Sequence, residues 1–295
     1  MVCWVLLLAG TGCEKRGPST RKPRADERTP KPVWLVVTRP PFESVLEPLV
    51  AHRKRLYEVH VSTRPVAKAI AALPRKPQML LLVGDWADDA ARKPWAVPTK
   101  TVPLYRWRHA QRKTFAADAL WGDLDGDGRP DVPVGRIPAR TPAEVRTVVQ
   151  KIIAYEKQKF VVGDLSLPVW AGAPGYGPLI DSVSTSTLLA VVQSDAPAWI
   201  EPWFLVGDRK HVLCGVPDRQ VTLWNERIRE PALLTAMIGH GTETTFHSMT
   251  ELGRAIDYTV KDTAALDRGK RVAAPMVILT CSSGRPGWWS GFLNG

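Results

Sequence analysis

Apolar positions along the chain follow two spacings, and these alternate from residue 33 onward. Short runs typical of strands, either apolar throughout or alternating, occupy residues 33–37, 57–62, 79–83, 167–171, 199–206, 233–238 and 275–280. Apolar residues recur at helical spacing over residues 42–57, 66–73, 145–155, 180–192 and 220–229. This alternation predicts an α/β fold in which a mostly parallel sheet is covered by helices on both faces.

One helix start is marked clearly in the sequence. Thr141 has the side chain of an N-cap, Pro142 suits the first helical position, and Glu144 completes a capping box. We therefore expect a helix to begin at residue 142 and to run through the apolar positions that follow.

The N-terminal segment differs from the rest of the chain. Residues 1–12 are apolar but too few to span a bilayer, and they indicate a secretory signal. The residues before Cys13 resemble a bacterial lipoprotein cleavage box, although no Lys or Arg precedes the run and Gly10 replaces a larger aliphatic residue. Residues 14–32 are basic and rich in proline, which predicts a disordered tether.

These features predict a signal in residues 1–13, a tether in residues 14–32 and a folded domain over residues 33–295. We expect an exported bacterial protein, either a cell-envelope lipoprotein or a secreted protein. Its contact with a membrane would come only from a lipid anchor on Cys13.

Composition narrows the class of protein. With 44% hydrophobic and 23% charged residues among 295, the chain has the composition of a globular protein. The net charge of +11 is partly due to the tether, where seven Lys/Arg against three Asp/Glu leave +4. No nucleic-acid-binding motif accompanies the charge, so we expect no nucleic-acid partner. The four cysteines match no zinc or disulfide pattern, and no cofactor for catalysis is expected.

Two predicted strands end at a reactive side chain. The strand at 233–238 is followed by Gly239-His240-Gly241, and the strand at 275–280 is followed by Cys281. Adjacent parallel strands would bring His240 and Cys281 to one carboxyl edge as a base–nucleophile pair. The N–H groups of Gly241 and Cys281 would then face a developing oxyanion. The alternatives are an ordinary glycine-rich loop and a cysteine packed as a small hydrophobe.

The arrangement resembles the gingipain-type cysteine peptidases, which have a caspase-like fold. Three further segments, 82–85, 122–138 and 175–181, resemble that family in the same order, so the resemblance covers residues 33–284. It implies a caspase-like α/β fold and an endopeptidase that cleaves a protein or peptide substrate. Cys281 would be its nucleophile and His240 its base.

The chain departs from the family at two places. A Glu that orients the catalytic His is expected where Ala173 stands. After Cys281, residues 285–286 are Arg-Pro instead of leading to an aromatic residue, and family members continue with further strands beyond the equivalent of Gly295. The resemblance therefore implies a domain that is incomplete at its C-terminus.

Three polar residues near this site have alternative interpretations. Asp181 matches the residue that selects Arg in the arginine-specific members of the family. A carboxylate at that place would favour Arg through a bidentate pair or Lys through a pair with a point charge. The alternative is an acidic residue stabilised by a helix N-terminus. Glu243 and His247 follow the Gly-His-Gly and either line the groove or belong to a solvated loop, which we favour.

An acidic loop suggests a metal site. Asp123, Asp125, Asp127 and Asp131 stand at positions 1, 3, 5 and 9 of a calcium loop, with glycine at position 6. Position 12 is Val134 instead of the bidentate Glu, so this is not a full EF-hand. The alternative is a solvated acidic turn. A bound calcium ion would be structural, because calcium is a poor activator of thiols.

The sequence therefore predicts an exported cysteine endopeptidase, with cleavage after Arg or Lys if Asp181 selects the substrate. A rival hypothesis is a non-catalytic relative that keeps the fold to bind peptides or a partner, which the absent Glu favours. A third is an unrelated α/β protein, which requires His240 and Cys281 to be distant in space.

Overall fold

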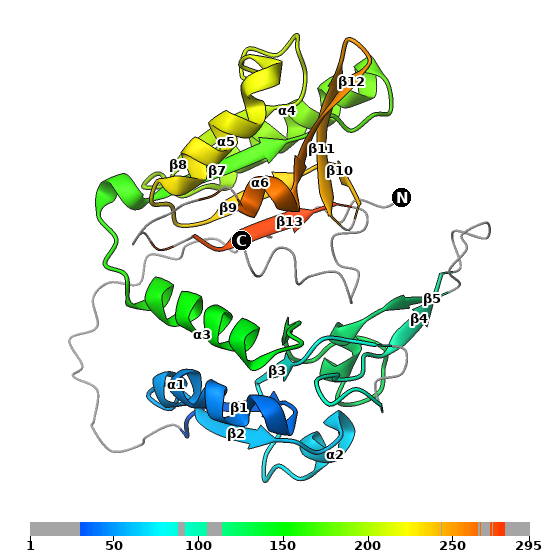
Figure 1. Cartoon of the computed structure of the whole chain (residues 1–295), viewed down its shortest axis with the longest axis vertical. Coiled ribbons are helices and arrows are strands. Elements are labelled where there is room, and N and C mark those ends of the chain that lie inside the picture. The colour runs from blue at the N-terminus through cyan, green and yellow to red at the C-terminus, as the bar shows by residue number, and fades with distance from the viewer. Residues whose placement is uncertain are drawn as a thin grey trace, which may run out of the picture. The chain divides into compact units, whose positions relative to one another are not determined.

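The computed structural model describes residues 30–87, 92–104, 114–242, 244–264, 266, 272 and 274–280 (Figure 1). Residues from Pro32 onward belong to one compact unit. The expected signal and nearly all of the expected tether lie outside the described residues, so both remain predictions. Within the described ranges, no helix has the length and apolar character that a membrane crossing requires.

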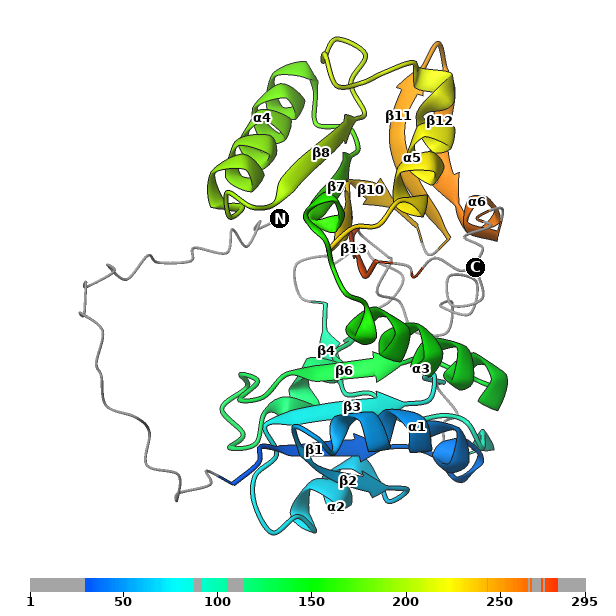
Figure 2. The same ribbon diagram turned by 90° about the vertical axis from the view of Figure 1, so that its left-hand side faces the viewer.

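The first sheet has four parallel strands in the order β2-β1-β3-β6 (Figure 2). Its strands are β1 Val33–Val37, β2 Glu58–Ser62, β3 Met79–Val83 and β6 Val134–Ile137. All five residues of β1 are buried, as expected for a central strand that is covered on both faces. Strand β6 was not predicted, because Gly135 and Arg136 interrupt its apolar pattern.

Helices cover both faces of this sheet. On one face, Trp34 and Val36 pack with residues of α1 Glu43–Arg53 and α3 Pro142–Lys157. On the other face, Leu35 and Val37 pack with residues of α2 Val66–Ala71. Alternate residues of β1 therefore contribute to two separate cores. The predicted start of α3 is confirmed, with Thr141 and Glu144 forming both hydrogen bonds of a capping box.

The second sheet also has four parallel strands, in the order β13-β9-β7-β8. Its strands are β7 Ser166–Ala171, β8 Glu201–Val206, β9 Thr235–Ile238 and β13 Met276–Leu279. Helices α4 Pro178–Asp195 and α5 Gln220–Arg229 lie on opposite sides of β7 and β8 (Figure 2). Trp170 of β7 is fully buried against Trp224 of α5, and their ring centroids are 5.4 Å apart.

A three-stranded antiparallel sheet follows β9 directly. It consists of β10 His240–Gly241, β11 Thr245–Glu251 and β12 Arg254–Thr259, and the short helix α6 Val260–Ala264 comes next. Phe246 and Tyr258 of this sheet join the core around Trp170. The remaining elements are the hairpin β4 Thr101–Pro103 with β5 Thr114–Ala116 and the 3₁₀ turns Pro40–Phe42, Asp118–Gly122, Val162–Asp164 and Pro217–Arg219.

The predicted α/β class with mostly parallel strands is confirmed. Among the described residues the parallel strands form two sheets instead of the one expected: β6 completes the first sheet, and the chain then passes through α3 into the second. Hydrophobic spacing predicts that a segment is a strand but does not encode which strands pair. The antiparallel hairpin of β11 and β12 was also missed, because Ser248 is a buried polar residue and a register shift between His247 and Met249 interrupts the alternation of β11.

Candidate active site

Strands β9 and β13 are adjacent and parallel, as the sequence predicted. Their register pairs Ile238 with Leu279, and the Gly239 N–H donates a hydrogen bond of 3.1 Å to the Leu279 carbonyl. His240 and Cys281 each stand two residues beyond this last pair. Cys281 lies outside the described residues, so the distance between the two side chains remains a prediction.

The last described residue before Cys281 packs against the residue after His240. A Cβ atom built on Gly241 would lie 2.9 Å from both the Cβ and the Oγ1 of Thr280. The same Cβ would lie 2.7 Å from the carbonyl oxygen of Thr245. Only glycine fits between these neighbours, and its absent side chain allows the end of β13 to approach β10 closely.

The His240 ring contacts the segment that follows β7, residues 172–177, which we call the 172–177 loop. The ring is half-buried, and its Nε2 forms a hydrogen bond with the main-chain carbonyl of Pro174. Tyr176 lies edge-on to the ring, with centroids 5.8 Å apart. Gly175 has a φ of +74°, and a Cβ there would lie 3.0 Å from Nε2. The loop therefore surrounds the Nε2 side of the imidazole.

Main-chain hydrogen bonds anchor the start of this loop. The Gly172 N–H donates to the Ile238 carbonyl at 2.8 Å, and the Ala173 N–H donates to the Ser248 carbonyl at 2.6 Å. A Cβ on Gly172 would lie 2.5 Å from the carbonyl oxygen of His247. The loop start is thus held against both β9 and β11, and Ala173 takes part through its backbone.

Asp181 lies in the first turn of α4, at the other end of the loop. Its Oδ1 accepts a hydrogen bond of 2.8 Å from the Tyr176 N–H, and its own N–H donates to the Gly177 carbonyl at 2.9 Å. The half-buried carboxylate therefore lies near the helix N-terminus. The residue that it binds, Tyr176, is two positions after Pro174, which contacts His240. Its selection of a basic substrate residue remains a prediction.

His247 belongs to β11 and not to a solvated loop. Its Nδ1 is 2.6 Å from Oδ1 of Asp257 on β12, and its Nε2 is 3.5 Å from the Thr250 hydroxyl. In the antiparallel ladder His247 stands directly opposite His240. Glu243 lies outside the described residues.

Cys214 is the described cysteine, and it is chemically protected. Only 2% of its surface is exposed, and its sulfur is 3.3 Å from Nε2 of Gln220 and 3.9 Å from the Met249 sulfur. Burial, with a further contribution from the negative charge of Asp208, raises the pKa of this thiol. A thiol that stays protonated is a poor nucleophile, so Cys214 is a packed core residue.

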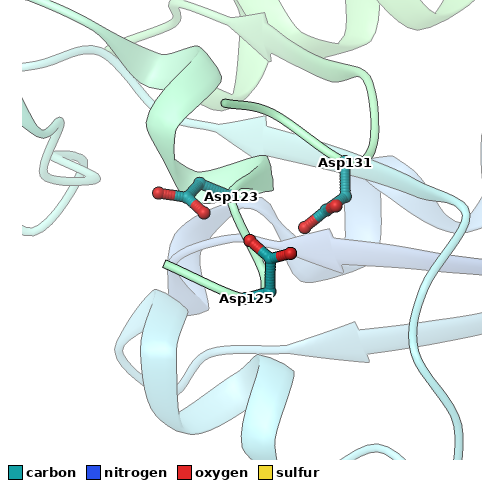
Figure 3. A group of neighbouring side chains, drawn as sticks. All are labelled: Asp123, Asp125 and Asp131. Carbon is teal, nitrogen blue, oxygen red and sulfur yellow. The ribbon is translucent and has the colours of Figure 1, made fainter. Parts of the chain in front are cut away.

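The acidic loop brings three of its four carboxylates together (Figure 3). One oxygen from each of Asp123, Asp125 and Asp131 lies within 4.8 Å of the others, and among the described residues this is the group that could hold a metal ion. Asp127 is not part of the group, and its Oδ1 accepts a hydrogen bond of 2.8 Å from the Arg129 N–H. The three-oxygen set matches the hard ligands that calcium prefers.

Comparisons with known proteins agree with this architecture. The family model described as "Peptidase family C25" matches residues 27–292. A solved structure described as "Structure of Protease" superimposes with a TM-score of 0.57 at 15% sequence identity, covering 89% of this chain. That likeness shows the fold, and this chain spans 56% of the length of that structure. No curated protein sequence matches significantly.

Proposed function

The chain belongs to peptidase family C25, the gingipain family, and on this premise we propose that it is a cysteine endopeptidase acting on protein or peptide substrates. The observation that carries the proposal is the parallel register of β9 with β13, which pairs Ile238 with Leu279. His240 and Cys281 follow these residues at equal distances along the chain, and the chain leaves β9 and β13 at the same edge of the sheet.

The proposed reaction uses a cysteine–histidine pair. His240 accepts the thiol proton as the Cys281 sulfur attacks the peptide carbonyl carbon, and the electron pair of the C=O bond moves to oxygen. The N–H groups of Gly241 and Cys281 stabilise this oxyanion. As the C–N bond breaks, His240 returns the proton to the leaving amine. Water, deprotonated by His240, then hydrolyses the thioester, and the thiol regains its proton.

Asp181 is proposed to favour substrates with Arg or Lys before the cleaved bond. A carboxylate pairs with a guanidinium or ammonium group, and the bond from the Tyr176 N–H leaves its second oxygen available for such a pair. The support from geometry is that Asp181 joins the loop that contacts His240. Replacement of Asp181 by Asn should reduce kcat/KM for arginyl substrates more than for uncharged ones.

We also propose that the acidic loop binds a structural calcium ion. Asp123, Asp125 and Asp131 supply three oxygen ligands close together, and a cation would relieve the repulsion between them. Calcium should raise the Tm of the full chain, and the Asp125→Asn variant should lose that increase. An equal response of variant and parent would contradict the assignment.

Export remains a proposal that rests on residues 1–13. The apolar run and Cys13 support a lipidated, cell-envelope protein. Expression of the full chain in a bacterium, followed by mass measurement of the mature N-terminus, tests this directly. A mature protein that begins with a diacylated Cys13, and loss of that species in Cys13→Ser, would support it.

The peptidase proposal is tested by covalent labelling of the full chain with an arginyl peptide chloromethyl ketone. Intact mass should reveal one adduct, located on Cys281 and lost in Cys281→Ala and His240→Ala. Cys214→Ala is the matched control and should be labelled like the parent, because Cys214 is buried. A folded protein without an adduct would favour the non-catalytic relative, in which case Cys281→Ala and the parent should bind the same peptide equally.

A further inference from the structure

We infer that the 172–177 loop is the element that positions His240, with the Pro174 carbonyl accepting a hydrogen bond from Nε2 and Asp181 holding the loop in place. The inference rests on the proposed function and extends it. In the family a Glu side chain orients the catalytic His, but this chain has Ala173 at that position. The inference assigns the orienting role to the main-chain carbonyl of Pro174 instead.

The contact at Nε2 determines which nitrogen of His240 can act as the base. A carbonyl oxygen only accepts hydrogen bonds, so Nε2 must carry a proton to make this contact. In the neutral ring Nδ1 then has the free lone pair. Nδ1 is therefore the atom that takes the proton of Cys281. The resulting imidazolium keeps its Nε2–H bond to Pro174, and the carbonyl dipole stabilises the positive charge.

Packing around the ring favours the same orientation. Tyr176 lies edge-on at 5.8 Å between centroids, and Gly175 leaves no side chain beside Nε2, where a Cβ would come within 3.0 Å. A ring flip would replace the Nε2 contact with a carbon facing the Pro174 carbonyl, which would leave that contact unmade. The 172–177 loop thus provides the hydrogen bond from Pro174, the ring contact from Tyr176 and, at Gly175, the space that the imidazole occupies.

The loop can position His240 only if it is itself fixed at both ends. Its first end is bonded to Ile238 and Ser248 through the main chain. Its second end depends on a side chain, because Oδ1 of Asp181 accepts the Tyr176 N–H at 2.8 Å. Asp181 is therefore a positioning residue, and it is the accessible point for a test, since a carbonyl cannot be removed by substitution.

Substitutions of Asp181 separate positioning from charge recognition. Asp181→Asn keeps an oxygen that accepts the Tyr176 N–H but removes the negative charge. Asp181→Ala removes both. Asp195→Ala is the matched control, because Asp195 is an exposed carboxylate at the far end of the same helix.

The rate measurement uses iodoacetamide, a small uncharged reagent that needs no basic-residue pocket. Its alkylation of Cys281 at neutral pH is followed by mass in the full chain. Asp181→Ala should react slower by about tenfold or more, since a misplaced reacting group costs up to about 100-fold. Asp195→Ala should react like the parent, and Asp181→Asn should keep more of the parent's rate than Asp181→Ala, because its side-chain oxygen still accepts the Tyr176 N–H. Equal rates for Asp181→Ala and the parent would overturn the inference, as would equal losses in the Asn and Ala variants.

A second readout does not depend on catalysis. In the full chain carrying Cys281→Ala, ¹⁵N NMR of labelled histidine identifies which nitrogen of the neutral His240 ring bears the proton, with His240→Gln providing the assignment. We expect the Nε2–H tautomer in Asp181→Asn and a mixture of tautomers in Asp181→Ala. An Nδ1–H ring in the Cys281→Ala protein would overturn the inference. An Nε2–H ring together with an unreactive Cys281 would support the positioning and refute the peptidase.

Discussion

Substitution of Gly241 by Ala tests the geometry on which the site depends. The added methyl group would lie 2.7 Å from the Thr245 carbonyl oxygen and 2.9 Å from the Thr280 side chain. The first contact involves backbone, which cannot rotate away, and the second involves the residue next to Cys281. The ends of β10 and β13 must therefore move apart to accommodate it.

The size of the effect follows from these contacts. Ordinary van der Waals contact begins near 3.4 Å, so the methyl group is about 0.7 Å too close to the Thr245 carbonyl oxygen. Overpacking of this kind costs about 1–3 kcal/mol. At roughly 2–4 °C per kcal/mol for a domain of this size, the Tm should fall by several degrees. Alkylation of Cys281 should slow as well, because its chain neighbour is displaced relative to His240.

The assay combines thermal unfolding with the rate of Cys281 alkylation. Gly163→Ala is the matched control, since a Cβ on Gly163 meets nothing within 4 Å and its backbone is not in the left-handed region. The control should change neither value. If Gly241→Ala is as stable and as reactive as Gly163→Ala, then Gly241 and Thr280 are not in contact, and the argument that β9 and β13 deliver the pair together fails.

Three further predictions concern the rest of the fold. Thr141→Ala should lower the free energy of unfolding by about 1 kcal/mol through loss of the α3 N-cap, measured by urea denaturation, and an unchanged midpoint would contradict the capping role. Ser248→Ala should lower the free energy of unfolding by about 1–3 kcal/mol in the same assay. The Ser248 hydroxyl accepts a hydrogen bond of 3.0 Å from the buried Trp170 Nε1 and donates one of 2.6 Å to Gln220, and both are lost. Stability equal to the parent would show that water replaces the hydroxyl. Burial raises the pKa of Cys214, so its thiol contributes stability below the ordinary thiol pKa and loses that contribution as pH rises through the raised value. Because Cys214 is buried, it should react with a thiol reagent in the Cys281→Ala variant only after unfolding in urea. Rapid reaction of Cys214 in the folded protein would contradict the burial.

Local features of the sequence predicted local structure well. The Thr141 capping box marks the start of α3, and the apolar spacing over 220–229 coincides with α5. The order of strand, Gly-His-Gly, strand and Cys predicted that β9 and β13 are adjacent, because connected strands in parallel sheets tend to be neighbours. These inferences depend only on propensity and chain order, which the sequence encodes directly.

Features that depend on non-local contacts were not predictable in this way. The division of the parallel strands into two sheets depends on which strands pair. In β6, Gly135 and its neighbour Arg136 interrupt the apolar pattern, so the sequence does not indicate a strand there. The contact between Pro174 and His240 involves a main-chain carbonyl, which any residue type provides. Asp181 could be singled out by family resemblance, but its bond to the Tyr176 N–H depends on how the 172–177 loop folds against the start of α4. The glycine at position 175 was the available clue, since it marks a close approach of backbone to another group.

The most direct test of the account is the distance between the His240 imidazole and the Cys281 sulfur in a crystal structure of the full chain. We expect Nδ1 of His240 to face the sulfur at or slightly beyond hydrogen-bond reach, about 2.6–3.2 Å in a closed site, with Nε2 bonded to Pro174. A separation well beyond about 8 Å would mean that the two residues do not form a catalytic pair, and the proposed peptidase mechanism would be wrong.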